Sequence, residues 1–253
     1  MSSTMMMEHE NKSYRKEYFI PEKKNIPREL FGIVEFVELL SKIPDLSKIP
    51  VSGRGEIVLV LPGYGTDDKI MSPLRKFLKH LGYDARGWGL GENHGNVPQL
   101  LEQVKDLIIR YYRESNRKII VIGWSLGGYI GREAARELQD MVEKVITLGS
   151  PIIGGPKYTS IGDLYGKRYD INLDELEVEI DKRFENALQI PLFSLYSKND
   201  NIVSWQSCID KYSPNAINQE VNSTHLGLIG NYEVYCWIGE YLRMGKEEKY
   251  SDF

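Results

Sequence analysis

The chain has 253 residues, of which 42% are hydrophobic and 27% are charged, and its formal net charge is -4. These values are typical of a globular protein that buries a sizeable core in a single domain. The small negative charge excludes a general attraction to nucleic acid or anionic lipid, and no apolar run approaches the roughly 18 residues that span a bilayer.

The N-terminal region divides into an arm and a helix. Residues 1–26 are polar and charged, so we expect a flexible arm there, and the lack of a basic leader or apolar signal core predicts a cytoplasmic protein. Over residues 27–43, beginning at Pro27, apolar side chains recur at helical spacing: Leu30, Phe31, Val34, Phe36, Val37 and Leu40. This amphipathic helix either contacts a membrane surface or packs on the domain. We favour packing because the polar face carries Glu35 and Glu38 rather than a basic stripe.

The rest of the chain alternates apolar strands with amphipathic helices. We predict strands at 57–61, 83–88, 119–122, 142–148, 191–196 and 216–221, and helices at 70–81, 98–113, 126–138 and 232–242. Strands that alternate with helices of this length are typical of crossover units. The fold class is therefore α/β, a mostly parallel sheet covered by helices on both faces.

The alternation breaks between residues 152 and 190, where we expect a small cap inserted between two strands. Leu173, Leu176, Ile180 and Phe184 share one helical face in this insertion. The acidic stretch from Asp174 to Asp181 is most simply a solvated face, and a role in gating the substrate stays open.

The central motif reads Lys-Ile-Ile-Val-Ile-Gly-Trp-Ser-Leu-Gly-Gly over residues 118–128. A continuous apolar strand, a sharp turn at Ser125 and a following helix are the context of a nucleophile elbow. Gly123 and Gly127 leave space for the strand and the helix to approach each other. Ser125 is therefore the candidate nucleophile.

Two glycine-rich loops follow earlier strands. The loop Pro62-Gly63-Tyr64-Gly65-Thr66 stands where an oxyanion site belongs, and we expect the backbone N–H groups of Tyr64 and Leu126 to bind the oxyanion. The segment 87–95 lacks the spacing of phosphate and dinucleotide loops, so we interpret it as a pocket rim with a structural or solvent-facing His94.

An acid and a histidine follow Ser125 in the order that an elbow serine requires. Asp200 comes just after the strand at 191–196, and His225 lies in the loop after the strand at 216–221. All these loops follow the carboxyl ends of strands, where open parallel sheets place their chemistry. In this arrangement the histidine would take the proton of Ser125, and Asp200 would orient the imidazole.

These motifs resemble the α/β-hydrolase superfamily, and within it bacterial esterase and lipase-like proteins. The resemblance covers about residues 55–242, through the segments at 61–65, 81–91, 123–128 and 148–151 and those around Asp200 and His225. It implies the α/β-hydrolase fold with about eight strands, a Ser-Asp-His triad and no cofactor or metal. Pro62 stands where many relatives carry His, which is a departure in the oxyanion loop.

Three functions are compatible with these motifs. The first is a serine hydrolase of carboxylic esters that acts on a small acyl ester or lipid-like substrate through an acyl-enzyme on Ser125, with Trp88 and Trp124 lining an acyl pocket. Both tryptophans could equally be core residues. The second is an acyltransferase or thioesterase with the same triad, since the scaffold hosts several reactions. The third is a catalytically silent binding protein. Cys208 and Cys236 could pair, but we expect free thiols.

Overall fold

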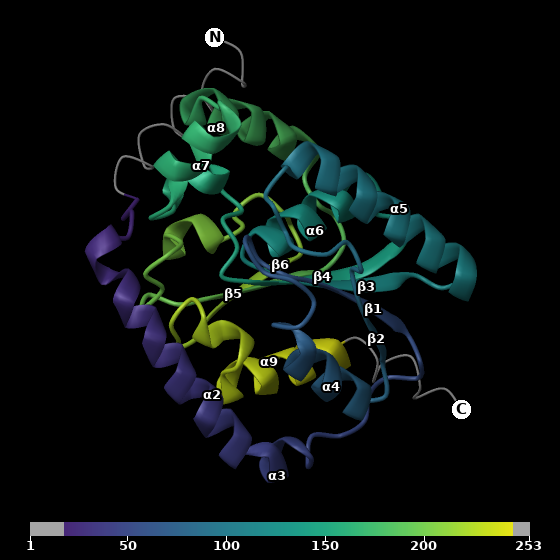
Figure 1. Ribbon diagram of the computed structural model, residues 1–253. Helices are drawn as coiled ribbons and strands as arrows, with labels where there is room; N and C mark the ends of the chain where they lie inside the picture. The colour runs from purple at the N-terminus through teal and green to yellow at the C-terminus, as the bar shows by residue number, and fades with distance from the viewer. Residues whose placement is uncertain (1–17, 245–253) are drawn as a thin grey trace.

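A computed structural model describes residues 18–244 of the chain. This part of the chain contains one sheet of six parallel strands in the order β2-β1-β3-β4-β5-β6 (Figure 1). The strands are β1 (Ile57–Leu61), β2 (Asp84–Gly87), β3 (Ile119–Trp124), β4 (Val142–Leu148), β5 (Leu192–Tyr196) and β6 (Ala216–Glu220). The predicted α/β class and parallel sheet are confirmed, with six strands rather than the eight that the resemblance implied.

Helices cover both faces of the sheet (Figure 1). The helices α5 (Val97–Ser115) and α6 (Leu126–Glu137) lie on one face, and α4 (Ser72–His80) and α9 (Tyr232–Arg243) lie on the other. Successive residues of a strand point to opposite faces. Val58 and Val60 of β1 accordingly join one buried cluster, while Leu59 and Leu61 join the other. Burial on both faces explains the continuous apolar runs in the sequence.

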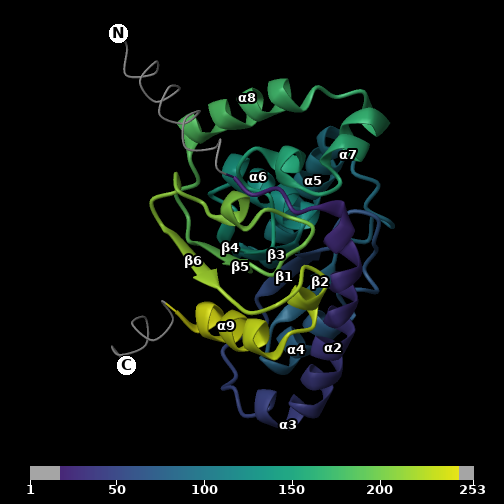
Figure 2. The same ribbon diagram turned by 90° about the vertical axis from the view of Figure 1, so that its left-hand side faces the viewer.

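The insertion between β4 and β5 is helical, in the region where a cap was predicted. It consists of η3 (Gly155–Tyr158), α7 (Gly162–Tyr169), α8 (Leu173–Arg183) and η4 (Phe184–Asn186). Figure 2 shows α7 and α8 on the same side of the sheet as α5 and α6. Ile180 is buried on the predicted inner face of α8, whereas most acidic residues of that helix remain accessible to solvent.

The N-terminal segment forms η2 (Lys23–Phe31), α2 (Gly32–Ser41) and α3 (Ile43–Leu46), which run along the outside of the domain (Figure 1). The predicted helix is present, but the predicted packing face is wrong. Val34 and Val37 are 62% and 60% exposed, whereas Glu29 is only 8% exposed. The glutamates turn inward because loop N–H groups need acceptors there, as described below. Residues 1–17 of the predicted arm lie outside the described residues.

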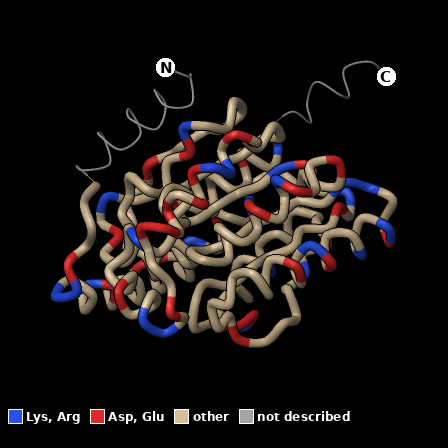
Figure 3. Tube along the Cα trace, turned by 90° about the horizontal axis from the view of Figure 1, so that it is seen from above, with Lys and Arg blue, Asp and Glu red and all other residues tan. Residues whose placement is uncertain are grey.

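The charged residues do not divide into separate regions along the chain, because Lys and Arg lie interspersed with Asp and Glu (Figure 3). Between residues 18 and 244 no helix is long and apolar enough to cross a membrane. Cys208, in η5 (Trp205–Cys208), is buried with a free thiol, and the partly buried Cys236 is also free.

Candidate active site

Ser125 lies at the sharp turn between β3 and α6. Its backbone has φ 54° and ψ -127°, a conformation that side-chain-bearing residues rarely adopt and that costs about 1–3 kcal/mol. A side chain at Gly123 would collide with the backbone of Gly128, and one at Gly127 would collide with the carbonyl oxygen of Pro62. The glycines are thus required by the close approach of three backbone segments.

The structure brings the three candidate residues of the triad together. Nε2 of His225 lies 2.9 Å from Oγ of Ser125, and Nδ1 lies 2.6 Å from Oδ2 of Asp200. His225 and Asp200 are buried, while Ser125 remains partly accessible. This geometry gives a continuous hydrogen-bonded path from the carboxylate through the imidazole to the hydroxyl.

Asp200 and His225 are held by hydrogen bonds from their surroundings. Oδ1 of Asp200 accepts hydrogen bonds from the backbone N–H groups of Ile202 (2.8 Å) and Val203 (2.7 Å), which leaves Oδ2 for the imidazole. The indole Nε1 of Trp124 donates to the carbonyl oxygen of His225 at 3.0 Å. Because an ionised Asp200 accepts from Nδ1–H, the network assigns the tautomer whose Nε2 can accept the Ser125 proton.

The surroundings of His225 favour the protonated form of its imidazole. Burial by itself lowers the pKa of His225, but the charge and hydrogen bond of Asp200, with a smaller effect from Glu29, outweigh burial and leave the pKa above its ordinary value. A proton taken from the serine would therefore be held more firmly than by a free imidazole.

The predicted oxyanion loop lies against the serine. A Cβ placed on Gly63 would come within 3.1 Å of the Ser125 Cβ, so the two backbones are in close proximity. Leu126 is the first residue of α6, and its N–H therefore has no acceptor inside the helix. Tyr64 follows Gly63 in the loop, and its hydroxyl accepts a hydrogen bond from Arg168 of α7 at 2.7 Å.

Asn93 is a functional candidate that the sequence reasoning missed. It is fully buried, and its Nδ2 donates to the carbonyl oxygen of Pro62 at 2.9 Å. Its backbone exchanges hydrogen bonds with Gly65 and Thr66 at 2.8 Å each. The glycine-rich segment 87–95 thus supports the candidate oxyanion loop at 62–66, and only the placement of a polar Asn among glycines hinted at this. His94 beside it is solvent-exposed.

A small cavity of about 30 Å³ opens at Ser125. Its lining comes from the two candidate oxyanion residues, from the loop after β4, from the cap and from the Asp200 loop: Tyr64, Leu126, Pro151, Pro156, Thr159, Ile161, Tyr165, Ile202 and Val203. Trp88 and Trp124 do not line it, which corrects the expectation of a tryptophan acyl pocket. Both indoles are buried in the core, where Trp88 donates to Gly91 and Trp124 holds the histidine loop.

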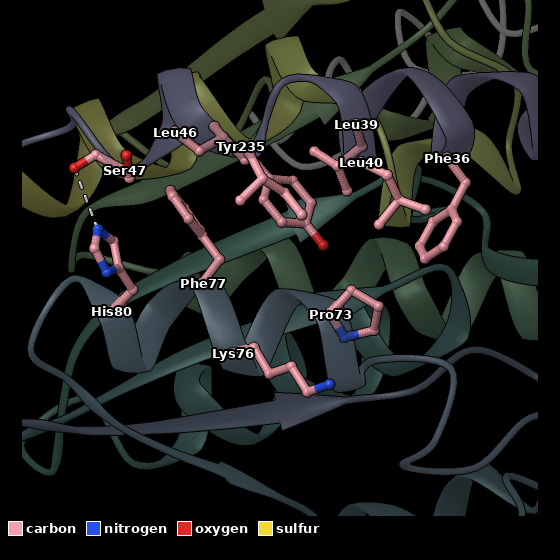
Figure 4. Close-up of a pocket in the computed structure, with 11 residues that line it drawn as sticks. Phe36, Leu39, Leu40, Leu46, Ser47, Pro73, Lys76, Phe77, His80 and Tyr235 are labelled. Atoms are coloured by element: carbon pink, nitrogen blue, oxygen red, sulfur yellow. Dashed lines mark hydrogen bonds between the residues drawn. The ribbon is translucent and has the colours of Figure 1, made fainter.

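A larger apolar cavity of about 410 Å³ lies elsewhere, between the N-terminal helices and α4 and α9 (Figure 4). Phe36, Leu39 and Leu40 of α2 border one side of it, and Pro73 and Phe77 of α4 border the other. Ser125, Asp200 and His225 are absent from its lining. Of these three residues, Ser125 lines the small cavity under the cap, and His225 reaches it through the hydrogen bond to Ser125.

Comparison with known proteins agrees with this architecture. The sequence model of the Alpha/beta hydrolase family matches residues 57–211. Pimeloyl-[acyl-carrier protein] methyl ester esterases of Photorhabdus laumondii and Vibrio cholerae are 28% identical over 142 residues and 24% identical over 175 residues. These matches cover 54% and 65% of this chain but only 50% and 64% of the two relatives.

Solved structures share the fold at low sequence identity. A structure of the metagenome-derived lipolytic enzymes LipS and LipT superposes with a TM-score of 0.60 at 13% identity, over 77% of this chain and 95% of that one. At this identity the likeness concerns the fold alone.

Proposed function

Since this chain belongs to the Alpha/beta hydrolase family, we propose that it is a carboxylic ester hydrolase that works through an acyl-enzyme on Ser125. The observation that carries the proposal is the path from Asp200 through His225 to Ser125, with distances of 2.6 and 2.9 Å. The names of the curated relatives, which are methyl ester esterases, support the choice of an ester substrate.

In the first half of the reaction, His225 Nε2 takes the proton of Ser125 as Oγ attacks the ester carbonyl carbon. Asp200 stabilises the imidazolium through Nδ1–H. The tetrahedral intermediate then collapses, His225 gives the proton to the leaving alkoxide, and the acyl group remains on Oγ. In the second half, His225 activates a water molecule in the same way, and the acid is released.

The negative charge on the carbonyl oxygen is stabilised by the backbone N–H groups of Tyr64 and Leu126. Such donors act in a site fixed before the reaction, and loss of one donor typically costs about 2.7–4 kcal/mol of barrier. Gly63 and Asn93 hold the first donor near Ser125, and the α6 N-terminus supplies the second.

The cavity dimensions guide the choice of substrate. A volume of about 30 Å³ between Ser125 and the cap suits a small acyl group. A longer acyl or lipid-like chain would require movement of α7, which carries Tyr165 over the cavity. Acyl transfer to an alcohol or thiol acceptor uses the same acyl-enzyme and is the second candidate function. Cytoplasmic location stays a prediction, and contact of the 27–43 helix with a membrane surface stays the less favoured alternative.

The test is labelling with a fluorophosphonate probe, which reacts with an activated serine. We expect the wild-type protein to be labelled at Ser125 and to hydrolyse p-nitrophenyl acetate. Ser125→Ala should lose both properties, and the distant Ser115→Ala should keep both. An unlabelled but folded wild-type protein, also unreactive toward smaller probes, would refute the enzyme assignment. Faster transfer to a low concentration of alcohol than to water would favour the transferase.

A further inference from the structure

The N-terminal segment reaches the loops that carry Asp200 and His225. The carboxylate of Glu29, in η2, lies between the two loops, and each of its oxygens accepts hydrogen bonds from one loop. Its Oε1 accepts from the backbone N–H of Asn201 at 2.9 Å and from the Asn201 side chain at 3.1 Å. Its Oε2 accepts from the backbone N–H of Leu226 at 2.9 Å. Glu29 therefore touches the residue after Asp200 and the residue after His225.

A second glutamate holds the residues before His225. Oε1 of Glu35, in α2, accepts from the backbone N–H of Thr224 at 2.8 Å and from its hydroxyl at 2.9 Å. Oε2 accepts from Ser223 at 2.5 Å and from Asn231 at 2.7 Å. Together the two glutamates bracket the histidine loop from residue 223 to residue 226.

Carboxylates suit this position because they accept several hydrogen bonds at once and bind N–H donors more strongly than neutral acceptors do. Glu29 is 8% exposed, so its charge is held inside the fold by these donors. The loop N–H groups of Asn201 and Leu226 would otherwise need water or another acceptor.

The polar contacts also explain the orientation of the helix. Gly32 lies so close to the histidine loop that a Cβ there would come within 2.8 Å of the Gly227 nitrogen. Leu39 is the buried apolar residue of α2, and it borders the open cavity of Figure 4 together with Phe36 and Leu40. At the histidine loop, the contact is therefore made by glutamates and by backbone rather than by an apolar face.

We propose that Glu29 is a positioning residue, which fixes the Asp200 and His225 loops relative to each other, and that Glu35 of the following helix α2 anchors the histidine loop to the same N-terminal segment. The inference rests on the proposed function of Ser125. Glu29 and its two loop partners are 172 and 197 residues apart in sequence, so an N-terminal segment outside the sheet completes the support of the reaction centre.

Glu29 also contributes charge near the imidazole. Three charged groups lie at or beside His225. Asp200, from the loop after β5, contacts the imidazole, Glu29 of η2 contacts the next residue, Leu226, and Glu35 of α2 contacts the preceding residue, Thr224. The charge of Glu29 raises the pKa of His225. Substitutions of Glu29 can thus separate its effect on the position of the loops from the effect of its charge on the pKa of His225.

The experiment compares Glu29→Gln and Glu29→Asp with the same changes at Glu38, an exposed glutamate of the adjoining helix α2. Rates of ester hydrolysis are normalised to the sites titrated by a fluorophosphonate, so that unfolded protein does not count. A displacement of about 1 Å can cost about a hundredfold in rate. We expect kcat of both Glu29 variants to fall about 10- to 100-fold, with KM changed less than about twofold.

The pH profile separates the two effects. Glu29→Gln removes the charge, so the acid limb of kcat/KM should move to lower pH. Glu29→Asp keeps the charge but shortens its reach, so kcat should fall while the limb stays close to that of the wild type. Both Glu38 variants should match the wild type.

The proposal is overturned if the titrated sites of both Glu29 variants turn over at the rate of the Glu38 variants with an unchanged acid limb. If the folded wild-type protein neither hydrolyses esters nor labels at Ser125, the proposed function fails first. If the wild-type protein hydrolyses esters and labels at Ser125, unchanged kcat and an unchanged acid limb in both Glu29 variants refute only the positioning role of Glu29.

Discussion

Oδ2 of Asp200 lies 2.6 Å from Nδ1 of His225, and both side chains are buried. The other oxygen of Asp200 accepts two backbone N–H groups, so the carboxylate can neither rotate nor exchange partners without losing bonds. This contact sets the imidazole tautomer that can accept the proton of Ser125.

Asp200→Asn should therefore lower kcat about ten-thousand-fold while the protein stays folded, because an amide NH₂ toward Nδ1 favours the wrong tautomer. The measurement is steady-state hydrolysis of p-nitrophenyl acetate, with circular dichroism to check folding. Asp140→Asn, at an exposed position, is the control. A loss of less than tenfold would contradict the role of Asp200.

The pH dependence of activity follows from the raised pKa of His225. The neutral imidazole is the base, so kcat/KM should fall as the pH drops through a midpoint above the ordinary histidine value of about 6.5. Because folding raises this pKa, His225 contributes stability that is fully present below its unfolded pKa and is lost as the pH rises through the folded pKa. Activity and this stability contribution thus change in opposite directions.

The measurements are a kcat/KM profile and urea unfolding between about pH 5 and pH 9. An acid limb that persists unchanged in the residual activity of His225→Ala would show that another group titrates.

Asn93→Asp tests the support of the oxyanion loop. The carboxylate has nearly the same shape, but it cannot donate to the carbonyl oxygen of Pro62. We expect kcat to fall about 10- to 100-fold, because the Tyr64 N–H would move away from the reacting oxygen. Asn96→Asp, in the same loop, is the matched control because Asp also caps the start of α5. Equal kcat values for the two variants would contradict the role of Asn93.

The cap should determine acyl-chain length. Tyr165 of α7 lines the cavity at Ser125 and donates its hydroxyl hydrogen to Gly95 at 2.8 Å. A panel of p-nitrophenyl esters should show the wild type fastest with acetate or butyrate, and Tyr165→Ala shifted toward longer chains. Tyr169, whose ring packs on Tyr165 at 4.8 Å, is absent from the lining, so Tyr169→Ala should keep the wild-type preference. An identical preference in all three proteins would remove Tyr165 as a determinant.

A buried ion pair fixes the helix that follows Ser125. Arg132 of α6 donates to Oδ2 of Asp210 through Nε at 3.1 Å and through Nη2 at 2.8 Å, and both side chains are fully buried. Burial raises the pKa of Asp210, but the charge of Arg132 and backbone hydrogen bonds outweigh it and lower the pKa overall.

Asp210→Ala leaves the guanidinium without its main partner and should lower the free energy of unfolding by about 3–5 kcal/mol. Urea unfolding measures this change. Glu102→Ala, which breaks the surface pair with Lys105, should have little effect. Similar urea midpoints for the two variants would show that the buried pair contributes little to the free energy of unfolding.

The sequence by itself determined the sheet, the helices and the order of the reactive residues. Continuous apolar runs such as 57–61 and 142–148 identify strands buried on both faces, and the residues after each run fall on one edge of a parallel sheet. For this reason Ser125, Asp200 and His225 could be placed together before their distances were known.

Only the tertiary structure decided which polar groups support that edge. Helical periodicity predicted that the apolar face of 27–43 packs inward, yet Glu29 and Glu35 turn inward because their hydrogen-bond donors come from loops far along the chain. The tertiary contacts also placed Trp88 and Trp124 in the core and Asn93 against the loop proposed to bind the oxyanion. Periodicity records which residues avoid water, but it does not identify the partner of a buried polar group.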